Sequence, residues 1–224
     1  MADRPAETAP PEPVRAKRLV QAEFPLVETG KGEHMTKFTI FDETNAPAES
    51  KATLCSVKSK YGFIPNLMGE LAASPAALDA YTSLSTIYGQ TSLSPIEQQV
   101  VLLTTSFENN CNYCVAAHST VSLSVGLDRE MLLAIREGRE IESDMRLEAL
   151  RRFTIAVVRQ RGLVENTDVE AFMEAGFTKA NILDVVTGVT LKTLSNYTNH
   201  IAETKLDDAF EAMKWSKPIL QHAD

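Results

Sequence analysis

The sequence predicts an all-α fold of about eight helices. Three observations support this prediction: helix start and stop signals recur along residues 46–224, residues 146–161 form a long amphipathic stretch, and the alternation typical of half-buried strands is nearly absent. The chain has 224 residues, of which 44% are hydrophobic and 23% are charged, so a sizeable core can form. We therefore expect residues 46–224 to form one helical domain.

The first predicted helices are bounded by capping residues. Ser74 and Pro75 fit the N-cap and the first position of a helix, and Gly89 fits its end. The run Ser94–Glu97 matches a capping box with proline at the favoured first position, which predicts a helix over residues 95–107.

The end of this helix decides the surroundings of two cysteines. Asn109 and Asn110 could end the helix, or they could cap a second helix that begins at Cys111. A fresh start would place Cys111 and Cys114 in a first turn, where the positive end of the helix dipole favours thiolate. A continuous helix through residue 118 would remove this contribution, and the sequence leaves both possibilities open.

The rest of the chain carries similar signals. Thr167 and Glu170 have the spacing of a capping box. Further candidate helix starts are Asp128, Ser143 and Thr178, and further candidate ends are Gly138, Gly162 and Gly176.

Residues 1–45 are expected to form a flexible N-terminal arm, because they hold five prolines and show little apolar periodicity. Within this arm, Met35 could be the natural start of the protein.

Composition argues against several classes of partner. Lys and Arg total 22 against 30 for Asp and Glu, a net charge of -8 without a dense basic stripe, so we expect no nucleic-acid partner. The apolar runs are far shorter than the roughly 20 residues that cross a bilayer, so we expect no membrane span. Three cysteines without an apolar signal region favour a reducing cytoplasm. Cys55 stands apart and is expected to be a small buried hydrophobic residue.

The run from Cys111 to His118 carries the clearest chemical signal. In a helix, Cys111, Cys114 and His118 fall within an arc of roughly 60°, so two thiols and an imidazole share one face. A neighbouring positive charge or a helix N-terminus lowers a thiol pKa and produces the reactive thiolate. The spacing therefore predicts a nucleophile, its activator and a second sulfur.

Two other interpretations of the cysteine pair are half of a zinc site and two inert buried thiols. A structural zinc needs four ligands, yet no second cysteine pair exists and the remaining histidines are His34, His200 and His222. Redox chemistry is favoured, with no metal and no cofactor. His200 follows a polar run near the end of an apolar helix, so it could line a cavity or satisfy helix ends.

Over residues 60–210 the chain resembles the alkylhydroperoxidase D and carboxymuconolactone decarboxylase group, in particular its thiol-bearing, peroxidase-related branch. The resemblance is carried by Gly62–Asn66, Ser74–Pro75, Leu93–Pro95, Asn110–His118, Gly126–Leu127 and Asn196–His200. It implies an all-helical alkylhydroperoxidase D-like fold and a homo-oligomer, either a trimer or a hexamer. Decarboxylase members of the group lack the cysteine pair.

The resemblance also implies roles for the motif. Cys114 would attack a peroxide and become a sulfenic acid, and Cys111 would resolve it as an intramolecular disulfide. His118 would accept or relay the thiol proton, and an external dithiol would reduce the disulfide.

One position departs from the family pattern. The proton-relay glutamate expected twelve residues before the first cysteine is Gln99 here, and an amide cannot shuttle a proton at neutral pH. Glu97 lies nearby, but the predicted capping box occupies its carboxylate. Glu108 is our preferred substitute, with a surface carboxylate as the alternative.

These observations predict a cytoplasmic thiol peroxidase acting on hydrogen peroxide or organic hydroperoxides. Two alternatives stay open: a redox-sensing subunit without turnover, and an enzyme with the chemistry of the decarboxylase members.

Overall fold

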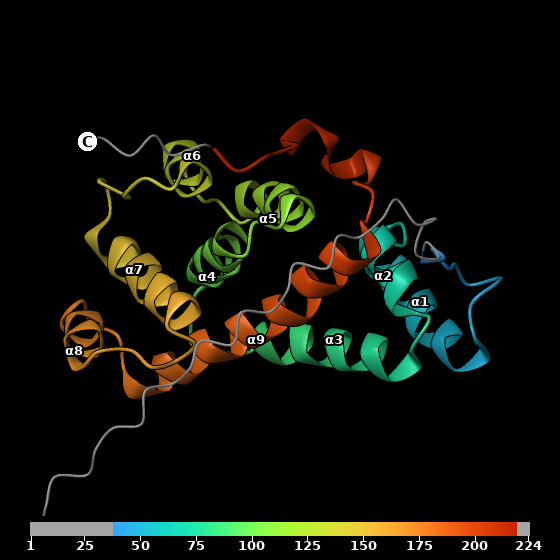
Figure 1. The fold of residues 1–224 in the computed structure, drawn as a ribbon, viewed down its shortest axis with the longest axis horizontal. Helices are drawn as coiled ribbons and strands as arrows, with labels where there is room; N and C mark the ends of the chain where they lie inside the picture. Colours follow the sequence, from blue (N-terminus) through green and yellow to red (C-terminus); the bar gives the residue numbers. More distant parts are fainter. Residues whose placement is uncertain (1–37, 219–224) are drawn as a thin grey trace, which may run out of the picture. The chain divides into compact units, whose positions relative to one another are not determined.

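A computed structural model describes residues 38–218, which form nine α-helices and one 3₁₀ helix without a strand (Figure 1). The predicted all-α class is therefore confirmed. In chain order the helices are α1 (Ala48–Tyr61), α2 (Asn66–Leu71), α3 (Pro75–Tyr88), α4 (Pro95–Glu108), α5 (Asn112–Ser124), α6 (Arg129–Glu137), α7 (Met145–Arg159), α8 (Asn166–Glu174), α9 (Lys179–Ala202) and the 3₁₀ helix η1 (Asp208–Met213).

Helix α4 is the centre of the core. It packs most extensively against α7, α5 and α9, and its side chains Val100, Val101 and Leu103 have no exposed surface. Because this helix is apolar on nearly all sides, helices must cover it all round.

The longest helix, α9, also contacts α2, α3 and α7 (Figure 1). Its close approach to α3 and α4 needs a glycine: a Cβ atom on Gly188 would lie 2.8 Å from side-chain atoms of Tyr88 and Val101. One face of α9 is thereby held against α3 and α4, and α9 also contacts α5, which carries the cysteine motif.

Most of the predicted caps are observed. Ser74, Asp128 and Thr178 cap their helices through side-chain oxygens, and Gly138 ends α6 in the left-handed conformation. Local hydrogen bonding is sufficient to fix these ends, which is why they can be recognised in sequence.

Two predicted starts are wrong by one or two residues. Helix α7 is capped by Asp144 rather than Ser143, and α8 has a capping box of Glu165 and Asp168, which leaves Thr167 inside its first turn. In both cases a carboxylate takes the capping position, and charged acceptors bind backbone N–H groups more strongly than hydroxyls.

The chain breaks between α4 and α5, so of the two possibilities that the sequence leaves open, the structure has the fresh start at the cysteines. Asn110 has a φ of 56°, a left-handed conformation that asparagine tolerates better than most residues. The turn is closed by the amide of Cys111, which donates to the carbonyl of Ser106 at 2.9 Å.

Residues 38–45, which the sequence assigned to the arm, pack against α2. The Phe41 amide donates to the carbonyl of Gly69 at 3.1 Å, and a Cβ atom on Gly69 would lie 2.7 Å from Ile40 Cγ2 and from the Phe41 carbonyl oxygen. The helical unit therefore begins before residue 46. The rest of the predicted arm, Met35 included, lies outside the described residues.

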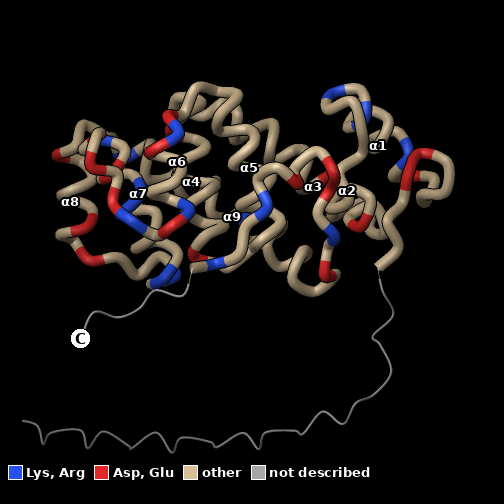
Figure 2. The backbone as a smooth tube through the Cα atoms, turned by 90° about the horizontal axis from the view of Figure 1, so that it is seen from above, with Lys and Arg blue, Asp and Glu red and all other residues tan. Residues whose placement is uncertain are grey.

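Charged residues are distributed unevenly among the helices. Figure 2 shows both signs of charge interspersed over the outer helices, whereas α5 holds no Lys, Arg, Asp or Glu. Within residues 38–218, no helix has the length and the hydropathy of a membrane span.

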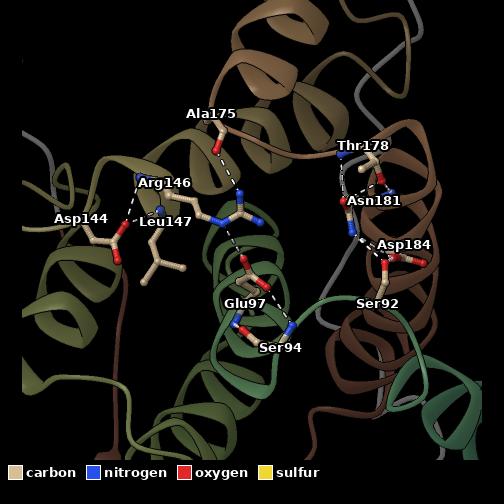
Figure 3. A network of polar contacts seen from close by, with 10 residues as sticks. All are labelled: Ser92, Ser94, Glu97, Asp144, Arg146, Leu147, Ala175, Thr178, Asn181 and Asp184. Atoms are coloured by element: carbon tan, nitrogen blue, oxygen red, sulfur yellow. Dashed lines mark hydrogen bonds and ion pairs between the residues drawn. The ribbon is translucent and has the colours of Figure 1, made fainter.

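The carboxylate of Glu97 ties α4 to α7 (Figure 3). It accepts a hydrogen bond from the amide of Ser94 at 2.8 Å and one from Arg146 Nε at 3.0 Å. Arg146 in turn donates to the carbonyl of Ala175 at 3.0 Å. Glu97 therefore has the structural role predicted from its capping box.

Glu97→Ala should lower the free energy of unfolding by about 1–2 kcal/mol, because it removes the cap and leaves Arg146 without its carboxylate. Urea denaturation measures the change. Glu142→Ala is the matched control, since Glu142 is exposed and forms no ion pair among the described residues, and it should change stability by less than about 0.5 kcal/mol. Equal effects of the two substitutions would contradict the structural role of Glu97.

Candidate active site

The two cysteines of the motif lie at the start of α5. Cys111 is the N-cap, and Cys114 is the third residue of the helix. Both thiols therefore face the positive end of the helix dipole, which stabilises an anion. Each residue is only 1% exposed, so neither side chain belongs to the outer surface.

Helix α9 supplies polar partners for the sulfur atoms. The amide Nδ2 of Asn199 lies 3.1 Å from Cys114 Sγ and 3.7 Å from Cys111 Sγ, and Ser195 Oγ lies 3.9 Å from Cys114 Sγ. The Oδ1 atom of Asn199 is buried without a hydrogen-bond partner among the described residues. The Asn199 amide thus points its N–H donor at the sulfurs and leaves its carbonyl oxygen without a hydrogen bond. A donor in this position stabilises a negative charge on sulfur.

His118 lies between Gln99 of α4 and Lys192 of α9. Its Nδ1 is 2.9 Å from Gln99 Oε1, and its Nε2 is 3.0 Å from Lys192 Nζ. An ammonium group can only donate, so Nε2 accepts from Lys192 and Nδ1 carries the ring proton that it donates to Gln99. Burial, followed by the charge of Lys192, lowers the pKa of His118 well below its ordinary value. The ring is therefore neutral.

The lysine and the Cys114 thiol stabilise each other's charged forms. Burial opposes ionisation of Cys114, but hydrogen bonding with Cys111 and the charge of Lys192 outweigh burial and hold its pKa well below the ordinary value. The pKa of Cys111 is raised, first by its hydrogen bond to Cys114 and then by burial. Burial likewise opposes the charge of Lys192, but the Cys114 sulfur outweighs it and raises the pKa of the ammonium. The result is a thiolate at Cys114 and an ammonium at Lys192.

A cavity of about 160 Å³ opens beside Cys114. Cys114, His118 and Lys192 form its polar part. The remaining lining is mostly apolar and includes five aromatic residues: Tyr61, Phe63, Tyr81, Tyr113 and Phe210. Cys111 does not line this cavity, so Cys114 is the sulfur that a small molecule in it would meet.

One wall of the cavity is fixed by the segment after α9. The Tyr113 hydroxyl donates to the carboxylate of Asp207, which also accepts from the amide of Asn66 at 3.0 Å. Phe210, three residues later in η1, packs edge-on against Tyr113. A single carboxylate thus fastens this wall to the turn of α5 that carries Cys114.

The structure brings together four of the five residues that the sequence singled out. Cys111, Cys114, His118 and Gln99 form one connected cluster with α9. Glu108 does not join it, because its carboxylate is bound by Arg159 Nε at 2.7 Å and by Nη2 at 3.1 Å.

The structure also bears on His200, on Cys55 and on the grouping of side chains that could bind a metal. His200 is exposed and lies outside the cavity lining. The expectation that Cys55 is buried is wrong, because its position on α1 is exposed. Within residues 38–218, no three side chains of the His, Cys, Asp and Glu types are grouped to hold a metal ion.

Sequence reasoning missed Lys192, Ser195 and Asn199. These residues stand at spacings of three and four along α9, so they share one helical face, and Lys192 is a lone lysine in an apolar stretch. Lysine is almost never fully buried unless paired, so its position in this stretch was the available signal.

Comparisons with known proteins give a family match and several structures of the same fold. Residues 75–156 match the carboxymuconolactone decarboxylase family. No curated protein sequence matches the chain.

Several solved structures share the fold. One is an alkylhydroperoxidase AhpD core, an uncharacterized peroxidase-related protein from Ralstonia eutropha: the TM-score is 0.69 at 22% identity, over 80% of this chain and 96% of that chain. A peroxidase-related protein from Silicibacter sp. gives 0.66 at 18% identity, over 81% and 97%. A debrominase in complex with 2,3,4-tribromopyrrole gives 0.68 at 13% identity, also over 81% and 97%.

The resemblance found in the sequence is thereby confirmed at the level of family and fold. Residues 75–156 match the carboxymuconolactone decarboxylase family, and the chain folds like the alkylhydroperoxidase AhpD core.

Proposed function

We propose that this protein is a thiol-dependent peroxidase that reduces small hydroperoxides. The observation that carries the proposal is the position of Cys114 at the wall of a small cavity that Lys192 also lines, with Asn199 Nδ2 3.1 Å from its sulfur. A thiolate attacks peroxides whereas a thiol barely does, so the charge at this sulfur is the main requirement of the reaction. The aromatic lining favours organic hydroperoxides over hydrogen peroxide.

Cys114 is the attacking residue in this proposal. It lines the cavity and its pKa is lowered, whereas Cys111 lies behind it with a raised pKa. Attack on the terminal peroxide oxygen forms a sulfenic acid on Cys114 and releases an alcohol or water.

Cys111 then resolves the sulfenic acid. Its position three residues before Cys114 places the two sulfurs within the reach of a disulfide, and Asn199 contacts both of them. The thiol of Cys111 attacks the Cys114 sulfur, forms the disulfide and releases water. An external dithiol must restore the pair, and a homo-oligomer in the cytoplasm remains the predicted setting.

A second candidate function is thiol-dependent removal of halogen from a small aromatic compound. The five aromatic residues of the cavity favour it, as does the likeness to a debrominase whose structure contains 2,3,4-tribromopyrrole. In such a reaction the thiol pair gives two electrons, hydrogen replaces the halogen, halide leaves and the disulfide forms.

Cys114→Ser should reduce peroxide consumption with a dithiol reductant by at least about 100-fold, because a hydroxyl at this position is not ionised. Cys111→Ser should leave the first oxidation intact and accumulate sulfenic acid, detected by mass spectrometry. Cys55→Ser is the matched control and should keep full activity, since this cysteine is exposed and outside the cavity.

The outcomes separate the candidate functions. One equivalent of oxidation without turnover would favour a redox-sensing subunit. Release of halide from a brominated pyrrole, without peroxide consumption, would favour the second candidate. Peroxide consumption that survives loss of Cys114 would exclude the proposed mechanism.

The lowered pKa of Cys114 should appear in the pH dependence of its alkylation. Because the folded pKa lies below the ordinary value, a larger fraction of Cys114 stays thiolate as the pH falls from 8 to 6, and its alkylation rate should decline less than that of an ordinary thiol. Lys192→Met removes the positive charge, so the rate should fall with pH as for an ordinary thiol with a pKa of about 8.5.

Mass spectrometry of protein treated with a small alkylating reagent gives these rates. The Cys55→Ser background removes the exposed competing thiol. If alkylation of Cys114 in the parent protein followed an ordinary thiol titration, a preformed thiolate would be excluded.

A further inference from the structure

We propose that Lys192 is the acid that protonates the leaving oxygen of the peroxide. The inference rests on the proposed function and deepens it, because it assigns a proton donor where the family's glutamate is replaced by Gln99. Three sets of observations support it: the position of the lysine, the state of its neighbours and the requirements of charge.

Lys192 is positioned to reach both the thiolate and a bound peroxide. Lys192 is 1% exposed as a residue, and it lines the same small cavity as Cys114. Its amino group lies 3.0 Å from His118 Nε2, and the charge of the Cys114 sulfur acts on it. A peroxide whose terminal oxygen meets the sulfur would place its second oxygen close to this ammonium.

The groups that face Lys192 leave it as the available acid. From α5 come Cys111, Cys114 and His118, from α3 comes Tyr81, and α4 contributes Gln99 through His118. The neutral His118 ring has its only N–H directed to Gln99, so it has no proton to give to the cavity.

Two tyrosines of the cavity, Tyr81 and Tyr113, are disfavoured as proton donors by their surroundings. Burial raises the pKa of Tyr81 above its ordinary value. Burial and the neighbouring Asp207 raise the pKa of Tyr113, whose hydroxyl already donates to that carboxylate.

Neither of the two glutamates near the motif in sequence, Glu97 and Glu108, is free to act as the proton donor. Glu97 is bound by the Ser94 amide and Arg146, and Glu108 is bound by Arg159. Among the described residues no Asp or Glu forms an ion pair with Lys192, and the largest favourable influence on its charge is that of the Cys114 sulfur. The thiolate is therefore the counterion of the ammonium.

Loss of the thiolate counterion during the reaction favours proton transfer from Lys192. When the thiolate attacks, the S–O bond forms, the O–O bond breaks and the electron pair moves to the leaving alkoxide. The Cys114 sulfur then carries no negative charge, and a buried ammonium without a counterion is unfavourable. Transfer of the Nζ proton to the alkoxide yields the neutral alcohol and a neutral amine on Lys192.

The remaining steps restore the starting state. Cys111 attacks the sulfenic acid and water leaves as the disulfide forms. The external dithiol reduces this disulfide to two thiols, and the Cys114 thiol returns its proton to the Lys192 amine. His118 is a positioning residue in this cycle, because its Nε2 holds the amine beside the sulfur in both states.

The test compares two oxidants that differ in the basicity of the leaving group. Attack on tert-butyl hydroperoxide expels a strongly basic alkoxide that needs a proton, whereas attack on peracetic acid expels acetate, which does not. The second-order rate constants for oxidation of Cys114 are measured by stopped flow, with products identified by mass spectrometry. The quantity compared is the rate constant for tert-butyl hydroperoxide divided by the rate constant for peracetic acid. This ratio is independent of the thiolate fraction, so it reports protonation of the leaving group.

Lys192→Met should lower this ratio by about 100-fold or more, the usual contribution of a general acid. Lys192→Arg keeps a positive charge that does not give up its proton, so it should preserve the thiolate and still lower the ratio. Lys179→Met is the matched control, since Lys179 is exposed at the start of the same helix, and it should leave the ratio unchanged.

Circular dichroism establishes that each variant keeps its helices, and Lys192→Arg provides the comparison if Lys192→Met does not fold. A ratio that both Lys192 variants leave unchanged would overturn the role of Lys192 while leaving the peroxidase proposal intact. A wild-type protein whose Cys114 reacts with neither oxidant would overturn both.

Discussion

The buried pair of Lys192 and Cys114 is the interaction on which the rest of the site depends. A lysine that is 1% exposed requires an anion, and a thiol that is equally buried ionises only beside a cation. Each group therefore supplies the condition for the charge of the other. The helix dipole and Asn199 add donors around the sulfur, but Lys192 provides the full charge.

The fold can be understood as the support for this pair. Helix α5 carries the thiols and has no charged residue of its own, so the cation has to come from another helix. Helix α9 delivers it, and the close contacts at Gly188 hold α9 against α3 and α4. Because α4 fills the centre of the core and also carries Gln99, the same packing fixes the orientation of His118. The chemical state of one sulfur thus depends on three helices far apart in sequence.

The sequence predicted what local interactions determine. Helix caps and the common face of the cysteine pair arise from residues within one or two turns of each other, whereas the break at Asn109 and Asn110 was one of two possibilities that the sequence left open. The Cys-x-x-Cys spacing also carried the likeness to the family.

Long-range contacts account for what the sequence did not predict. Lys192 stands 74 positions after His118, and nothing in either local pattern specifies that the two side chains meet. Glu108 was favoured as the relay because it is close to Cys111 in sequence, but Arg159 of α7 takes its carboxylate in three dimensions. Cys55 was assigned from the average behaviour of cysteine, while the packing of α1 leaves that position in solvent.

The attachment of η1 through Asp207 has a consequence for how such sites diverge. The thiols, the lysine and the imidazole belong to α5 and α9, whereas Phe210 belongs to η1, which follows Asp207 and packs on α5. Substitutions in that segment can reshape the chamber without repacking the core. Part of the cavity wall is therefore encoded apart from the cysteines and the lysine, and substitutions there can change the cavity while preserving the sulfur cluster.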